Sequence, residues 1–103
     1  MGDSLYWLYC EIFEETTGCG NGNVRYIARG GKFRQNLSHS YEVGSQDDVK
    51  RKEACNSLVQ DLLKQGWQFE GHGSLYDQLP KGYHWWNLRF KCQINTPPSE
   101  YYI

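Results

Sequence analysis

The alternation of apolar and polar residues in the first half of the chain is typical of β-strands. Residues 5–13 (LYWLYCEIF) are rich in aromatic and β-branched side chains and too few for a capped helix, so they predict a strand that is apolar on both faces. Residues 23–29 and 32–43 follow with further alternation. Asn21-Gly22 and Gly30-Gly31 are turn sequences of the kind that join such strands. The three segments therefore predict an antiparallel meander.

A helical period follows from residue 45. Ser45, with Asp48 three residues later, predicts an N-terminal cap, and Gly66 stands where a helix commonly ends in a left-handed glycine. Between them, apolar residues recur at three- and four-residue steps and define one face. This face consists of Val49, Ala54, Cys55, Leu58, Val59, Leu62 and Leu63. The polar face carries Lys50, Arg51, Lys52, Glu53, Gln60, Asp61 and Lys64. The pattern predicts an amphipathic helix packed on the sheet.

Two more strands are predicted after the helix, over residues 67–76 and 84–94, with a long connection between them. The order along the chain is therefore β-β-β-α-β-β. It predicts an α+β fold, in which an antiparallel β-sheet has one helix packed on one face. We expect residues 4–95 to form this single domain. Pro97-Pro98 ends the last strand, and residues 96–103 form a C-terminal tail.

Length and charge narrow the class of protein. A chain of 103 residues fits one domain. The formal net charge of −1 provides no global positive field of the kind that drives non-specific nucleic-acid binding. The first residues contain no basic segment followed by an apolar run, and no stretch reaches the roughly 18 apolar residues of a membrane span. We therefore expect a cytoplasmic protein that does not act in a membrane.

The cysteines and histidines form no recognisable metal-binding pattern. The cysteines are Cys10, Cys19, Cys55 and Cys92, and the histidines are His39, His72 and His84. No C-x-x-C pair is present, as a zinc ribbon or a redox dithiol would require. We expect reduced structural thiols, no metal and no cofactor. Disulfides are the alternative if the protein is exported, and Asn36-Leu37-Ser38 would then be a glycosylation acceptor.

Two short motifs match catalytic signatures but lack their structural context. Gly2-Asp3-Ser4-Leu5 spells the nucleophile block of the GDSL hydrolases, yet no strand precedes it and no D-x-x-H follows to complete a triad. Residues 18–22 have the glycine spacing of a phosphate-binding loop, but a predicted strand follows where that loop needs a helix. No carboxylate pair is placed for acid–base catalysis. The sequence therefore predicts a protein that is not an enzyme.

The most informative feature is the sheet face turned away from the helix. Side chains alternate along a strand, so the residues between the inward positions must point outward. The candidate binding residues on this face are Trp7, Tyr9, Arg25, Arg29, Trp85, Arg89 and Lys91. Glu11 is the single acid expected among them. The parity of the strands thus predicts a face that combines aromatic rings with basic side chains.

Such a face is consistent with three uses. Trp, Tyr and Arg are enriched in the hot spots of protein interfaces, which favours a protein partner. The same residues could instead be covered by loops or by self-association in a homodimer. Aromatic rings with interleaved arginines also stack the bases of single-stranded nucleic acids. We expect a non-enzymatic binding or adaptor module of bacterial or phage type, with a single-stranded nucleic-acid-binding domain as the alternative.

The C-terminal half of the predicted domain carries a resemblance. A helix ends in Leu62-Leu63-Lys64-Gln65-Gly66-Trp67, Gly71 follows, and the last strand reads Trp85-Trp86-Asn87-Leu88-Arg89-Phe90-Lys91. This order resembles small uncharacterised bacterial domains that end in a helix, a Gly-Trp and an aromatic pair leading to Arg-Phe-Arg. That group implies no established activity, cofactor or ligand. The chain departs from it in the long loop at residues 75–83, where a separate function could lie.

Overall fold

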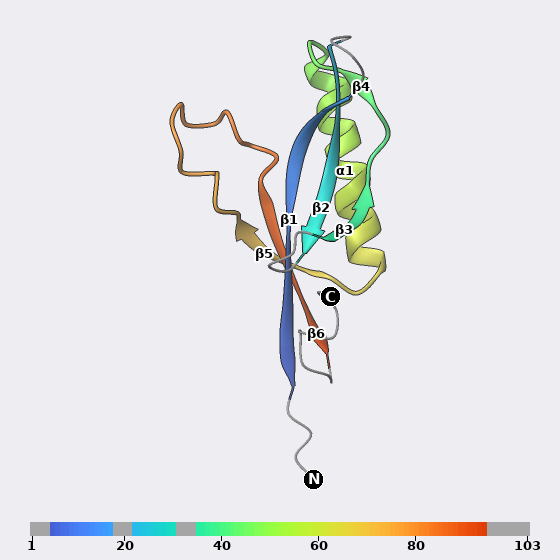
Figure 1. The fold of residues 1–103 in the computed structure, drawn as a ribbon, viewed down its shortest axis with the longest axis vertical. Coiled ribbons are helices and arrows are strands. Elements are labelled where there is room, and N and C mark those ends of the chain that lie inside the picture. Colours follow the sequence, from blue (N-terminus) through green and yellow to red (C-terminus); the bar gives the residue numbers. More distant parts are fainter. Residues whose placement is uncertain (1–4, 18–21, 31–34, 95–103) are drawn as a thin grey trace.

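The computed structural model describes residues 5–17, 22–30 and 35–94. In chain order its elements are β1 (Tyr6–Thr17), β2 (Asn23–Gly30), β3 (Gln35–His39), β4 (Val43–Gly44), α1 (Asp48–Lys64), β5 (Gln68–His72) and β6 (Leu88–Ile94). The strands form one antiparallel six-stranded sheet in the order β3-β2-β1-β6-β5, and β4 pairs with β2 (Figure 1). The predicted α+β class, an antiparallel sheet with one helix packed against it, is confirmed.

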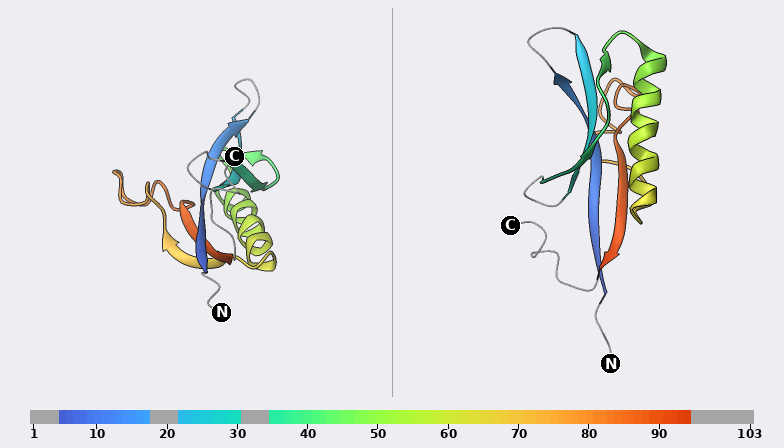
Figure 2. Two further views of the ribbon diagram at one scale, coloured as in Figure 1. Left: turned by 60° about the horizontal axis from the view of Figure 1, so that its bottom comes forward. Right: turned by 90° about the vertical axis from the view of Figure 1, so that its right-hand side faces the viewer.

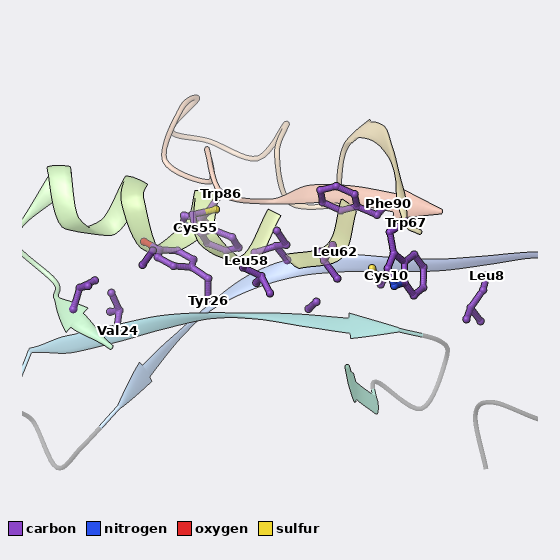
Figure 3. Close-up of a cluster of buried hydrophobic side chains, with 14 residues drawn as sticks. Leu8, Cys10, Val24, Tyr26, Cys55, Leu58, Leu62, Trp67, Trp86 and Phe90 are labelled. Carbon is purple, nitrogen blue, oxygen red and sulfur yellow. The ribbon is translucent and has the colours of Figure 1, made fainter. Parts of the chain in front are cut away.

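The helix α1 covers one face of the sheet, and no helix of the described residues covers the opposite face, which we call the outer face (Figure 2). Its buried side chains are Ala54, Cys55, Leu58 and Leu62. They belong to the same core as alternating residues of the central strands, namely Leu8, Cys10, Ile12, Val24, Tyr26, Ala28 and Phe90 (Figure 3). The side chains between these positions point to the outer face. The packing of α1 therefore determines which strand residues are left for a binding surface.

The helix is capped by Asp47, and the predicted Ser45 cap is wrong. The Asp47 carboxylate accepts a hydrogen bond from the backbone N–H of Lys50 at 3.0 Å, which satisfies one of the free donors of the first turn. Ser45 lies in the turn before the helix. At the other end the prediction holds, because Gly66 adopts a φ of 97° just beyond the last turn.

The apolar face of α1 is narrower than predicted. Val49 and Leu63 are 67% and 43% exposed, so neither is part of the core. Arg51 was predicted on the polar face, but its side chain is only 18% exposed and forms an ion pair with Glu14 of β1. The long arginine side chain can reach a carboxylate on the sheet from the margin of the helix. The helical periodicity of the sequence cannot predict this ion pair, because Glu14 lies on a strand distant in the sequence.

Several strands have bounds that differ from the predicted ones. β1 continues past residue 13, because its last four residues pair with the start of β2. The predicted strand over residues 32–43 is divided into β3 and β4. Between them, Ser40 binds Tyr26 twice, through its backbone N–H to the Tyr26 carbonyl and through its hydroxyl to the Tyr26 N–H. β5 and β6 are shorter than predicted, because residues 74–86 form a succession of turns.

The connection between β5 and β6 extends away from the sheet (Figure 1).

Several predicted features lie outside the described residues: the turns at Asn21 and Gly31, Cys19, the limits of the domain at residues 4 and 95, and the tail at residues 96–103. Within the described ranges α1 is the only helix, and it has neither the length nor the apolar character of a membrane-crossing segment.

Candidate functional site

Strand pairing places six of the seven predicted site residues on the outer face. These six are Trp7, Tyr9, Arg25, Arg29, Arg89 and Lys91. Tyr9 of β1 lies opposite Lys91 of β6. Glu11 of β1 lies between Arg29 of β2 and Arg89 of β6. Residues directly opposite each other on antiparallel strands share a face, so the strand register places side chains that are far apart in the sequence next to each other.

Four of the six residues form a compact group that we call the cation-capped patch: Trp7, Tyr9, Arg89 and Lys91. The Lys91 ammonium nitrogen lies 4.6 Å from the centre of the Trp7 ring. The Arg89 guanidinium carbon lies 4.5 Å from the centre of the Tyr9 ring. Both distances are within the range of a cation–π interaction. Trp7 is 38% exposed, so part of this aromatic surface remains accessible.

The other two arginines of the outer face are neutralised by one carboxylate. One carboxylate oxygen of Glu15 lies 2.8 Å from Arg25 Nη2, and the other lies 3.1 Å from Arg29 Nη2. Arg29 also donates from Nε to the Asn36 side-chain oxygen at 3.2 Å. We call this group the paired half of the outer face. Its arginines are already bound, whereas the cations of the cation-capped patch have no carboxylate within 4.0 Å among the described residues.

The outer face therefore carries two acids and four bases, and the prediction of a single acid is wrong. Glu15 was assigned to a loop because the predicted first strand ended at residue 13. Its parity matches that of Glu11, so a longer strand would have placed it on this face. The second acid, Glu11, is also engaged, because one of its oxygens accepts the Ser74 backbone N–H at 2.9 Å. The same oxygen accepts the Ser74 hydroxyl at 3.1 Å.

Glu11 and Asn87 anchor the long β5–β6 connection to the sheet. Strand parity predicts that Asn87 points outward like Arg89, but it is fully buried and donates from its side-chain nitrogen to the Ile12 carbonyl at 3.0 Å. Its side-chain oxygen accepts the backbone N–H of Leu75 at 2.8 Å. A side chain at Gly73 would collide with both Glu11 and Asn87, so glycine is required at this close approach. The base of the connection is therefore held beside the cation-capped patch.

Trp85 does not belong to the outer face, and its predicted position is wrong. Its ring centre lies 5.7 Å from that of Tyr26, a buried residue of the helix-side core. The Arg51 guanidinium carbon of α1 lies 5.7 Å from the Trp85 ring. Strand parity fails for Trp85 because β6 begins only at Leu88. The turn before β6 carries the ring to the helix side.

A buried polar cluster joins these helix-side residues. Glu14 accepts hydrogen bonds from the Tyr26 hydroxyl at 2.9 Å and from Arg51 Nη2 at 2.6 Å. Arg51 also donates from Nε to the Tyr26 oxygen at 3.2 Å. Burial and the hydrogen bond to Glu14 raise the pKa of Tyr26 above its ordinary value. These groups therefore satisfy one another's hydrogen bonds between the helix and the sheet.

The two buried thiols and the described histidines are candidate reactive or metal-binding groups. Burial raises the pKa of Cys10 and of Cys55 to about 12, which keeps both thiols protonated and weakly nucleophilic at neutral pH. His39 and His72 are exposed, and the His72 ring stacks on Tyr76 at 3.5 Å. In the described part of the chain, no three His, Cys, Asp or Glu side chains are grouped so as to hold a metal ion.

No protein-family model, curated protein or solved structure matches this chain. The geometry of the site is therefore the basis for any functional inference.

Proposed function

We propose that the protein is a non-enzymatic, cytoplasmic binding module that receives a protein partner on its outer face. The observation that carries the proposal is the cation-capped patch. Trp7 and Tyr9 lie under Lys91 and Arg89 on a face that α1 does not cover. Aromatic and arginine side chains dominate the binding energy of protein interfaces. A partner that covers the two rings and pairs with the two cations would use all four residues.

The small number of basic side chains without a carboxylate partner favours a protein partner over a nucleic acid. Glu15 already binds Arg25 and Arg29, so only Arg89 and Lys91 of the four bases lack a carboxylate among the described residues. Single-strand binders follow the phosphate backbone with a positively charged groove and stack successive bases on several rings. Trp85 is absent from this face, and of the rings that remain, Phe13 lies 5.9 Å from the guanidinium carbon of the paired Arg29, which leaves Trp7 and Tyr9 as the rings beside the two free cations. Two cations and two rings suit a small hot spot better than an extended strand of nucleotides.

The partner can be tested by photo-crosslinking from the proposed face. A benzophenone amino acid replaces Trp7 in one variant and Asn56, an exposed residue of α1, in the control. In cells of the source organism, we expect a discrete crosslinked protein from position 7 and none from position 56. The crosslink should weaken when Lys91→Glu is added, since that change removes a cation from the patch. Equal crosslinking at both positions would contradict the proposal.

Self-association is the second way to cover the face. A homodimer through the patch would give a concentration-dependent sedimentation coefficient that Trp7→Ser abolishes. In that case the crosslink from position 7 would have the mass of two copies of this chain.

Single-stranded nucleic acid remains the alternative function, because cations over aromatic rings also stack bases. Fluorescence anisotropy with a labelled 20-nucleotide poly-dT strand tests it. Contacts through Arg89 and Lys91 alone predict a log–log salt dependence of about −1.4, at roughly −0.7 for each phosphate contacted. Binding with this slope that is lost in Lys91→Glu would replace the protein-binding proposal.

A further inference from the structure

β1 is longer than the pairing on either of its sides. Within the parts of the chain that the structure describes, it pairs with β2 from Cys10 to Thr17 and with β6 from Tyr6 to Glu11. Among the described residues, Tyr6 to Tyr9 therefore have a neighbouring strand on one side only. Figure 1 shows the lower parts of β1 and β6 extending beyond the helix as a two-stranded ribbon. Backbone N–H and C=O groups along an open strand edge are ready to pair with another chain.

The outermost strands of the sheet differ from this edge in regularity. β3 has a register shift against β2, and β5 has one against β6 beside Gly71. Such bulges interrupt the ladder and disfavour the addition of another strand. By contrast, β1 pairs with β6 without interruption from Tyr6 to Glu11. The edge at Tyr6 to Tyr9 is therefore straight and suited to strand addition.

The charges beside this edge select the kind of strand that fits. Trp7 and Tyr9 lie on the edge itself, and Lys91 and Arg89 extend over their rings from β6. Arg89 Nε is buried and finds no hydrogen-bond partner among the residues that the structure describes. An added strand would place its outward side chains directly beside Trp7 and Tyr9. Carboxylates at those positions would meet unpaired cations, whereas basic side chains would be repelled.

We propose that the edge at Tyr6 to Tyr9 binds an extended, acidic segment of another protein, which adds to the sheet as an antiparallel or parallel β-strand. This inference rests on the proposed function and specifies its partner. The backbone ladder supplies affinity that is independent of side chains, and alternate acidic side chains supply specificity through Arg89 and Lys91.

Selection from a phage-displayed library of random 12-residue peptides tests the proposal on the immobilised full chain. We expect enriched peptides to carry Asp or Glu at alternate positions. Their affinity should fall by at least about tenfold in the Arg89→Glu/Lys91→Glu variant, since like charges would face each other. Lys52→Glu, a charge reversal on the exposed side of α1, should leave affinity unchanged. Lys91→Gln, a milder change, should reduce affinity to a smaller degree, which guards against a variant that misfolds. In NMR spectra, the amides of Tyr6 to Tyr9 should shift when the peptide binds.

The possible failures separate this inference from the proposed function. Enriched peptides without an acidic excess that still lose binding in Trp7→Ser would overturn the acidic strand and leave the outer face as the binding surface. Peptides whose affinity is unchanged in Trp7→Ser would overturn both. A selection that enriches no peptide would overturn the acidic strand, as would a dimer in sedimentation that Trp7→Ser dissociates, because a second copy would then occupy the edge.

Discussion

Two arginines of this protein lie over aromatic rings on opposite faces of the sheet, and their guanidinium groups have different surroundings. On the helix side, Arg51 lies 5.7 Å from the Trp85 ring and hydrogen-bonds to Glu14, Asp48 and the Tyr26 hydroxyl. On the outer face, the Arg89 guanidinium carbon lies 4.5 Å from the centre of the Tyr9 ring, and its buried Nε has no hydrogen-bond partner in the described part of the chain.

The difference separates an arginine bound within the fold from one that forms no ion pair among the described residues. Arg51 has its nitrogens engaged by neighbours, so its removal would leave buried polar groups unpaired. Among the described residues, Arg89 forms no ion pair, and its guanidinium lies over the Tyr9 ring beside the partly exposed Trp7. The same arrangement, a guanidinium over a ring, therefore belongs to the helix-side core in one place and to the proposed binding face in the other.

The largest expected effect is on the helix-side core. Leu58 is fully buried, so Leu58→Ala should lower the free energy of unfolding by about 2–5 kcal/mol through lost burial and the cavity left behind. The matched control is Leu63→Ala, at a position 43% exposed on the same helix, which should cost less than about 1 kcal/mol. Urea unfolding measures both. Equal losses would mean that α1 does not pack on the sheet by the face described.

The two arginines themselves give the next effect. Arg51→Met should lower the free energy of unfolding by about 2 kcal/mol, because Glu14 and the Tyr26 hydroxyl would lose their charged partner in a mostly buried place. Arg89→Met should cost less than about 1 kcal/mol, since it breaks no ion pair among the described residues. Thermal and urea unfolding of the pair provide the measurement. A larger loss of unfolding free energy in Arg89→Met than in Arg51→Met would mean that Arg89, and not Arg51, is the arginine that stabilises the fold.

Alkaline pH should weaken the helix-side core by a slightly smaller amount for each buried thiol. Burial raises the pKa of Cys10 and of Cys55 to about 12, so folding favours the protonated thiols. The stability that the protonated thiols contribute to the fold is fully present below the ordinary thiol pKa, and it is lost as the pH rises towards 12 because the unfolded chain then ionises its thiols. We expect a loss of about 1.5–2 kcal/mol per thiol at pH 10.

The variant Cys55→Ala isolates this effect. With one of the two thiols removed, its unfolding free energy should fall less between pH 7.5 and pH 10 than that of the parent, in urea titrations under reducing conditions. Parallel losses in the two proteins would show that the buried thiols do not titrate on unfolding in this range.

The sequence predicts the fold well because its signals are local. The alternation of residues 23–29 and the three- and four-residue steps leading to Leu58 and Leu62 depend only on neighbours along the chain, and the structure confirms a strand and a buried helix face there. The placement of Trp7, Tyr9, Arg89 and Lys91 on one face follows from the same alternation.

The errors arise where a partner distant in the sequence decides the outcome. Trp85 was placed by parity, but β6 begins three residues later, and the ring packs on Tyr26 instead. Asn87 is drawn inward by the Ile12 carbonyl, 75 positions away. Glu15 pairs with Arg25 and Arg29 only because β1 extends to Thr17. Hydrogen bonds of this kind cannot be inferred from periodicity.

The central claim is that the outer face is dispensable for the fold and available to a partner, and two tryptophans test it most directly. Trp7→Ser and Trp85→Ser remove the same side chain from opposite faces, and urea unfolding gives the free energy of each variant. The account predicts a loss of at least about 2 kcal/mol for Trp85→Ser, which removes packing against Tyr26 and Arg51, and about 1 kcal/mol or less for Trp7→Ser. A loss in Trp7→Ser as large as that in Trp85→Ser would contradict it, because the outer face would then be part of what holds the protein together.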